Sequence, residues 1–487
     1  MAFEWTGSAG TGDFSTAQNW NPSAGAPPGP SDLARIDGAA VPITGTGNPK
    51  ILYTTNTVRL AGHFTAAYGT PVNAQQLTLL PGAVLTTPML HFVVGIDANP
   101  PTVGNVKVDA GGTVVIAGSH TPDDYAIEMA ELGITTASSL VVEGAGSIVN
   151  GGNLPMAVGQ AGPSTLTIKD GGIVSVGNAD PLIYPWCLAI GNHQGSRGTV
   201  DVQHGSLLAR GQIIVGRNST GALTVDAGGV VIAENLAIGW EPKQQTGTAV
   251  TEGIGSVTVK GRDARLIVDN QLEIQHMGTG SLAVNEHGFV SAGVGIIVNG
   301  ALTLAKGMVD TQAIGIYEGA TLSGSGTVIA AQGINNSGGT ITADGKLIVV
   351  GDIDNPANTD PSIPMMIVAA HGELQCFGAL TDNGTLSLRD HSVASLEAVD
   401  AGQTISFDGQ HTKLVLRSPG VFAGSISGFK HNDKIVVEAD VTGIALTGSV
   451  LTVHGPGGTV IVQLQVTGPV PIFHLQQPGF PGVITAT

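Results

Sequence analysis

Charge and aromatic rings are scarce in this chain. Charged residues make up 11% of its 487 residues and aromatic residues 4%, against 42% hydrophobic residues. Disordered chains are rich in charge and poor in β-branched residues, so this composition excludes disorder. The 19 basic residues are outnumbered by 37 acidic ones, which gives a net charge of −18. Nucleic acid needs a basic face, so we expect no nucleic-acid partner.

Cysteine and long apolar runs are also nearly missing. Cys187 and Cys376 are the two cysteines of the sequence. A disulfide between them stays open, but two buried thiols are favoured. No run of about 18 apolar residues occurs, so we expect no membrane span. The first residues show no Sec-type signal, which leaves retention inside the cell, a removed leader, or another export route.

Glycine, in contrast, is abundant, and it recurs in a repeated phrase. The 72 glycines are about twice the usual share and follow no three-residue period, which excludes collagen. An alternating apolar run leads into a Gly-containing turn and then into a second apolar run. The phrase recurs at Val106–Val115, Leu166–Val174, Val200–Leu207, Leu223–Val231 and Leu282–Val290. Such self-similarity predicts a repeat architecture built from strands.

The spacing of the units supports stacked coils. The first strands begin at Val106, Leu140, Leu166, Val200, Leu223, Val257, Leu282, Leu302 and Leu322, which are 20 to 34 residues apart. In several units a second apolar run is followed directly by Gly, after Val158, Ile190, Val215 and Ile238. One coil therefore holds at least two strands. The longer units carry insertions at about 118–136, 178–186 and 240–252, which we expect to lie on one face.

We therefore predict an all-β fold, a parallel β-solenoid and most simply a right-handed β-helix. Its expected parts are an N-terminal cap with irregular first coils (1–100), a solenoid body with insertions on alternate coils (101–400), and a C-terminal β-rich cap or small β domain (401–487). Alternation in Leu-Thr-Ile and Leu-Thr-Val predicts that Ile168 and Val225 face inward, while Thr167 and Thr224 face outward.

Two stretches resemble a known group of proteins. The start, Trp5-Thr-Gly followed by Gly12-Asp13-Phe14, Asn19-Trp20 and Asp32-Leu-Ala-Arg-Ile36, is similar to the start of bacterial autotransporter-like, β-helical secreted surface proteins. The segment from Phe422 to Ile435 resembles a module at the C-termini of large proteins secreted by α-proteobacteria. The resemblance implies an exported adhesin, matrix or fibre-like protein, here without a translocator barrel.

Several β-helical proteins cleave polysaccharides, so catalytic residues were sought. Asp123, Asp124 and Glu128 in the first insertion are the candidate carboxylates, with Glu241 in a later insertion. Lyase chemistry would need a base such as Arg197, Arg210 or Arg217. A solvated acidic loop and turn-flanking charges explain these residues more simply, so the enzyme question stays open, with no activity favoured.

The aromatic residues suggest contact surfaces. Tyr184, Trp186 and Trp240 on the insertions either stack on sugar rings or cover an apolar flank. Trp5, Phe14, Trp20, Phe473 and Phe480 in the terminal segments are candidate assembly contacts, with the first three expected to be exposed.

Metal sites are not evident from the sequence. The thirteen histidines include pairs eleven residues apart, His193 with His204 and His276 with His287, but no zinc spacing. We expect no cofactor, with Ca²⁺ left open in the loop 352–360, whereas Asp382-Asn-Gly is shorter than an EF-hand loop and lacks its distal Glu.

These observations favour an extracellular, self-associating structural or adhesive protein, as a filament or biofilm-matrix subunit. The alternative is a polysaccharide-binding or polysaccharide-cleaving β-helix, namely a lyase, a glycosidase or a tail-spike-like protein.

Overall fold

The computed structural model describes residues 1–22, 25–92, 104–117, 125–130, 137–177, 186–241, 244–246, 249–357, 365–469 and 471–486. In these ranges the regular structure is β-strand, apart from three 3₁₀ turns at Ala17–Asn19, Pro419–Val421 and Pro456–Gly458. No helix in them is long and apolar enough to cross a membrane. The chain forms two compact units, residues 1–269 with 275–281 (unit 1) and residues 270–274 with 282–487 (unit 2).

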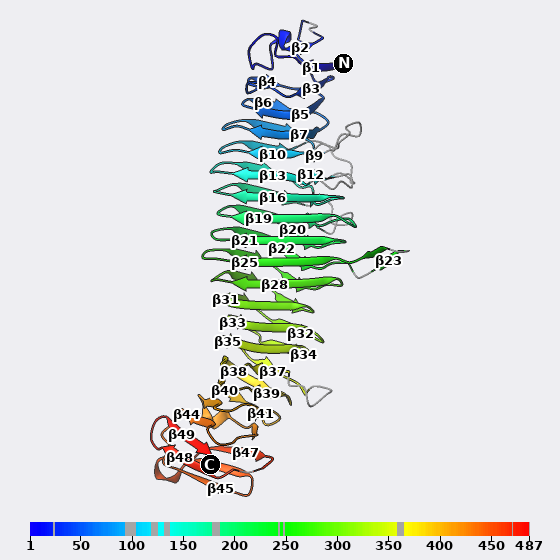
Figure 1. Cartoon of the computed structure of the whole chain (residues 1–487). Helices are drawn as coiled ribbons and strands as arrows, with labels where there is room; N and C mark the ends of the chain where they lie inside the picture. Colours follow the sequence, from blue (N-terminus) through cyan, green and yellow to red (C-terminus); the bar gives the residue numbers. More distant parts are fainter. Residues whose placement is uncertain are drawn as a thin grey trace. The chain divides into compact units, whose positions relative to one another are not determined.

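Unit 1 is a parallel β-solenoid whose coils add strands in turn to three sheets, here named A, B and C (Figure 1). Sheet A contains the second halves of β5 (Ile51–Leu60) and β7 (Thr70–Leu79), then β10 (Asn105–Val108), β13 (Ser138–Glu143), β16 (Pro163–Lys169), β19 (Arg197–Gln203), β21 (Thr220–Asp226) and β25 (Ile254–Lys260). Sheet B contains β4 (Thr46–Gly47), β6 (His63–Thr65), β8 (Val84–Thr87), β11 (Thr113–Ile116), β14 (Ile148–Asn150), β17 (Ile173–Gly177), the first halves of β20 (Ser206–Val215) and β22 (Val230–Ile238), and β26 (Arg265–Val268). Sheet C contains β3 (Leu33–Asp37), the first halves of β5 and β7, β9 (Leu90–Phe92), β12 (Ile127–Met129), β15 (Met156–Val158), β18 (Leu188–Ile190), and the second halves of β20 and β22.

Unit 2 repeats this three-sheet order. Its sheet A contains the first halves of β31 (Ala301–Thr311), β33 (Thr321–Ala330) and β35 (Thr340–Val350), then β37 (Met366–Val368), β39 (Thr385–Leu388), β41 (Thr404–Phe407) and β43 (Ser425–Ser427). Its sheet B contains β29 (Phe289–Ala292), the second halves of β31, β33 and β35, then β38 (Glu373–Thr381), β40 (Val393–Val399), β42 (Lys413–Leu416) and β44 (Lys434–Val437). Its sheet C contains β27 (Gln271–Ile274), β30 (Gly295–Val298), β32 (Ile314–Tyr317), β34 (Ile334–Ser337), β36 (Ile353–Asp354) and the ends of β38 and β40. The strand β28 (Thr279–Asn285) has residues in both units.

The alternation of side chains explains why these segments form strands. In β16, Leu166 and Ile168 are buried while Thr165 and Thr167 are half-buried on the outer face, as the sequence predicts. Val225 of β21 is likewise buried. The register pairs Leu166 with Leu140 and Val200, and Ile168 with Val142 and Val202. Aliphatic residues therefore stack on aliphatic residues from coil to coil, and this stacking forms the core of the solenoid.

Tight corners between sheets A and B use the repeated Gly-Gly phrase. Gly111 and Gly171 precede the sheet B strands by two residues and have φ of +83° and +90°. An L-residue is strained in this left-handed conformation, whereas glycine adopts it freely. The Gly-bounded phrase seen in the sequence is therefore the corner of each coil.

The N-terminal segment is a closed cap rather than an exposed aromatic surface. The strand β1 (Ala2–Trp5) pairs antiparallel with β2 (Trp20–Asn21) and parallel with β3. Phe14 and Trp20 are fully buried, and their rings meet edge to face 4.7 Å apart. Trp5 is half-buried against Trp20, 5.1 Å away. The expected exposure of Trp5, Phe14 and Trp20 is wrong, because these rings form the core that ends the stack.

The C-terminal cap begins later than predicted. The alternation at residues 413–417 and 434–438 is that of hairpin strands, but β42 (Lys413–Leu416) and β44 (Lys434–Val437) pair in parallel within sheet B. Antiparallel pairing begins with β45 (Gly443–Thr447), β46 (Val450–His454) and β47 (Val460–Thr467). The strands β48 (Phe473–Gln477) and β49 (Gly482–Ala486) pair with each other, and β49 also pairs antiparallel with β44. The alternation of residues was read correctly, but alternation does not distinguish a coil strand from a hairpin strand.

We expect Ile168→Asp to lower the free energy of unfolding by several kcal/mol, since it places an unpaired charge among stacked aliphatic residues. Thr165→Asp on the outer face of the same strand should change it by about 0.5 kcal/mol or less. Denaturant unfolding followed by circular dichroism measures both. Equal midpoints for the two variants would contradict the inward assignment.

A second stability prediction concerns Asn336, which is fully buried on β34 and has no hydrogen-bond partner for either side-chain polar atom. Its register partner on the preceding coil is Ile316. Asn336→Leu should raise the free energy of unfolding by about 1–3 kcal/mol, because it removes an unsatisfied buried amide. The control is Asn335→Leu on the exposed face, for which we expect little change. Thermal melts that show no gain for Asn336→Leu would refute this account.

Candidate ligand-contact flank

Part of sheet C in unit 1, from β12 to the end of β22, is buried on both faces, whereas outward residues of β3 such as Arg35 are exposed. Every residue of β12, β15 and β18 is buried, including the residues whose side chains point away from the core. In register, these outward residues are Glu128, Ala157, Ala189, Ile214 and Ala237. We call this outer face of sheet C the covered flank. Side chains from outside these strands must therefore lie over the covered flank.

Aromatic residues from the insertions provide this cover. Trp186 is 1% exposed and packs with Ala189 and Ile214, while Tyr125 and Trp240 lie half-buried against the same cluster. The rings of Tyr125 and Trp186 are 5.7 Å apart. Trp186 therefore has no open face for a sugar ring, and its predicted role as a carbohydrate contact is wrong. Trp186 instead covers an apolar flank, which is the other role that the sequence allowed for these aromatic residues.

Trp240 remains the more accessible of the two indoles. Its ring stacks on His276 with the ring centroids 4.2 Å apart and the planes 9° from parallel. Tyr184, the third aromatic residue predicted to contact a ligand, lies outside the described residues.

A polar ladder follows the covered flank. The strands β15, β18 and β20 are each followed by a glycine with positive φ, and the residues after these glycines are Gln160, Asn192 and Arg217. The side-chain amide of buried Asn192 donates hydrogen bonds to Gln160 Oε1 and, at 3.3 Å, to Tyr125 Oη.

Arg217 completes the ladder. Its Nη1 donates to Asn192 Oδ1 at 2.8 Å, and its guanidinium carbon lies 5.5 Å from the centre of the Trp186 ring. Burial lowers the pKa of His193, and the nearby Arg217 charge lowers it further. The ladder fixes the guanidinium against the aromatic cover, which is a structural role.

Along the chain, the predicted insertions adjoin strands of sheet C. Residues 118–124 and 178–185 precede β12 and β18, whereas residues 131–136 and 240–252 follow β12 and β22. Within the last insertion, β23 (Gln244–Thr246) and β24 (Ala249–Thr251) form an antiparallel hairpin, which projects from the coils in Figure 1.

The proposed catalytic carboxylates do not form a pair among the described residues. Asp123 and Asp124 lie outside those residues. Glu128 is buried on β12, where its Oε2 lies 4.0 Å from Nε2 of His91 on the neighbouring β9. Glu241 is half-buried, and its N–H donates to the carbonyl of Arg217.

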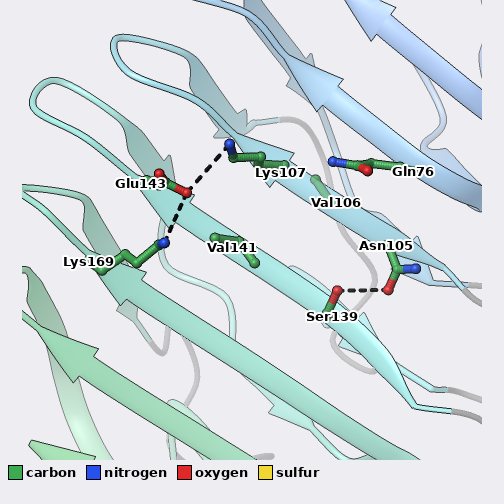
Figure 2. Close-up of a pocket in the computed structure, with 8 residues that line it drawn as sticks. All are labelled: Gln76, Asn105, Val106, Lys107, Ser139, Val141, Glu143 and Lys169. Carbon is green, nitrogen blue, oxygen red and sulfur yellow. Dashed lines mark hydrogen bonds and ion pairs between the residues drawn. The ribbon is translucent and has the colours of Figure 1, made fainter.

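The outer face of sheet A holds an open depression of about 400 Å³ (Figure 2). Glu143 lies between Lys107 and Lys169, with Nζ to Oε2 distances of 3.5 and 3.2 Å. Ser139 Oγ donates to Asn105 Oδ1 at 2.7 Å along the same face. Such exposed ion pairs contribute about 1 kcal/mol or less. The depression offers polar contacts without an enclosed reaction site.

Metal-binding residues do not converge in the part of the chain described. No group of three or more His, Cys, Asp or Glu side chains there is placed to hold a metal ion. Of the loop considered for Ca²⁺, residues 358–360 lie outside that part, and Asp352 Oδ1 accepts a hydrogen bond from the Ala379 N–H at 2.8 Å.

Sequence reasoning missed one alignment of histidines. His371, His391 and His411 are each 20 residues apart, which is the coil length in this region, and their rings stack on neighbouring coils. Comparing histidine spacing with the coil period would have found them.

With this geometry in hand, the chain was compared with known proteins. No protein-family model, curated protein or solved structure matches it. The function is therefore inferred from the residues and geometry of this chain.

Both cysteines are free, and burial raises the pKa of each thiol to about 12. The reactive thiolate is thus suppressed in the folded protein. We expect no reaction of Cys187 or Cys376 with a thiol reagent such as DTNB at pH 8, and reaction of both in guanidinium chloride. Rapid labelling of the native protein would contradict the buried placement.

Proposed function

We propose that this protein is a structural, adhesive β-solenoid that acts outside the cell and associates with itself through its C-terminal cap. The observation that carries the proposal is the unprotected outer edge of β45. Support for export comes from the resemblance of the N-terminal motif to secreted β-helical surface proteins.

The edge of β45 that does not pair with β46 carries no charge, proline or bulge, and on the chain around it Val441, just before β45, pairs with Gly479, just after β48. All five residues pair with β46 without a register shift, and none is charged or proline. Ala445, Leu446 and Thr447 are exposed. Natural edge strands are usually protected by charge, proline or a bulge, and an unprotected edge accepts another strand. A second copy of β45 is the partner that this edge fits.

The neighbouring strand β48 is better protected. Its pairing with β49 shifts register between Leu475 and Gln477, and Pro478 follows it. Phe473, predicted as an assembly contact, stacks on Phe429 with ring centroids 5.4 Å apart. Phe480 is 70% exposed and stays a proposed assembly contact.

Pairing at the C-terminal cap alone favours a closed pair over a filament. Filaments need two different mating surfaces, whereas an isologous contact uses the same surface twice and closes. The aromatic side chains predicted as N-terminal assembly contacts, such as Phe14 and Trp20, are instead packed inside the N-terminal cap. We therefore propose a two-fold pair of molecules, with β45 antiparallel to its copy.

The polysaccharide alternative has little support from the aromatic residues of the insertions. It depended on aromatic residues along the insertions, and Trp186 is covered, while Trp240 is stacked on His276. Polysaccharide contact remains a hypothesis that the depression on sheet A accommodates.

Leu446→Lys should abolish self-association, because a lysine on the edge opposes its own copy in the pair. We expect the wild type to sediment as a concentration-dependent dimer, and the variant to sediment as a monomer with an unchanged melting temperature. Analytical ultracentrifugation measures the difference. Val294→Lys is the matched control, since Val294 is 60% exposed elsewhere in unit 2. A wild type that stays monomeric at high concentration, or a dimeric Leu446→Lys variant, would overturn the proposal.

A further inference from the structure

Three histidines form a column on the corner between sheets A and B of unit 2. His371, His391 and His411 each precede a sheet B strand by two residues, namely β38, β40 and β42. These strands pair in register, Glu373 with Val393 and Val393 with Lys413. The histidines are therefore neighbours on consecutive coils.

This corner position normally favours glycine. In unit 1 it is occupied by Gly111, Gly171 and Gly228, but also by His204 and Asp263, all with positive φ. The three histidines adopt φ of +62°, +58° and +58° in the same position. A left-handed conformation costs an L-residue about 1–2 kcal/mol. Histidine is among the residues enriched in this conformation, so the turn accepts it at a single corner. What sets this corner apart is that histidine occupies it on three successive coils, which places the imidazoles in one line.

The rings are placed to act together. The centroids of His371 and His391 are 5.0 Å apart, and those of His391 and His411 are 4.9 Å apart, with the planes 23° and 22° from parallel. All three residues are exposed, so solvent reaches the column along its length.

We propose that adjacent pairs in this histidine column chelate a first-row transition-metal dication on the surface of the solenoid. Imidazole nitrogen is a preferred ligand of Cu²⁺, Ni²⁺ and Zn²⁺. Each pair supplies two ligands, and water supplies the others. This agrees with the finding that no three metal-binding side chains converge among the described residues.

Stacked rings do not themselves converge on a metal, because the lone pairs of near-parallel imidazoles run side by side. Exposed side chains change rotamer on the picosecond-to-nanosecond scale, so rotation of two neighbouring rings toward each other is accessible. Metal–nitrogen distances of about 2.0–2.1 Å would then hold the pair across two coils. Binding would link one coil to the next and stabilise unit 2 by mass action.

The middle histidine gives the sharpest test, because both possible pairs share it. Untagged, full-length protein would be titrated with Cu²⁺ by calorimetry, and its melting temperature measured with Cu²⁺ and after adding EDTA. His391→Asn leaves His371 and His411 two coils apart, so binding should weaken about tenfold or more. His371→Asn keeps the pair of His391 and His411 and should stay within about threefold of the wild type.

Asparagine suits these substitutions, since Asn432 occupies the same corner position on the next coil with φ of +73°. The matched control is His287→Asn, because His287 has the same corner position and φ of +71° but no stacked histidine on the next coil, where Lys306 occupies the position. Circular dichroism without metal checks that each variant folds.

The expected result is a reversible rise in melting temperature with Cu²⁺ for the wild type and His287→Asn, which is lost in His391→Asn. Mg²⁺ should produce no rise, because it prefers oxygen ligands. Equal Cu²⁺ affinity of His391→Asn and His287→Asn, or no binding by the wild type, would overturn the proposal.

Discussion

The structure depends on hydrogen bonding between parallel strands of successive coils, which requires every coil to place its strands in the same register. Residues such as Leu140, Leu166 and Val200 stack because their backbones pair directly. A one-residue slip would turn these side chains outward, so the aliphatic column and the backbone ladder fix each other. Tight corners follow from the same constraint, because a coil that returns to register has little room to turn. Glycine at these corners adopts the positive φ that the tight turn requires with the least strain.

The same constraint creates a problem at each end, where a strand has no further coil to pair with. The N-terminal end is closed by a short antiparallel strand and by buried rings, including Phe14 and Trp20. At the C-terminal end the direction of pairing changes, and the antiparallel strands β44 and β49 stop the parallel sheet. An antiparallel meander still ends in a strand that has one unpaired edge, and in this cap that strand is β45. Its unpaired edge is therefore the proposed contact surface.

Register also repeats any side chain that recurs with the coil period. On the covered flank of unit 1 it aligns Gln160, Asn192 and Arg217 into one hydrogen-bonded ladder. On a corner of unit 2 it aligns three histidines. A solenoid can therefore align residues 20 to 32 positions apart without any loop that reaches across the fold. Such alignments are linear.

The sequence by itself determined the class of fold, the inward positions such as Ile168, and the Gly-containing corners, because alternation and glycine spacing are local properties of strands and turns. It also located the insertions. Only the tertiary structure decided which aromatic residues are covered, since burial of Trp186 depends on Ile214 of the next coil as well as on Ala189 of its own. It likewise decided that Phe14 and Trp20 close the stack and that β42 and β44 are coil strands. Alternation predicts that a strand has two faces, but what lies against the outer face, and whether the neighbouring strand runs parallel or antiparallel, depends on contacts between distant residues.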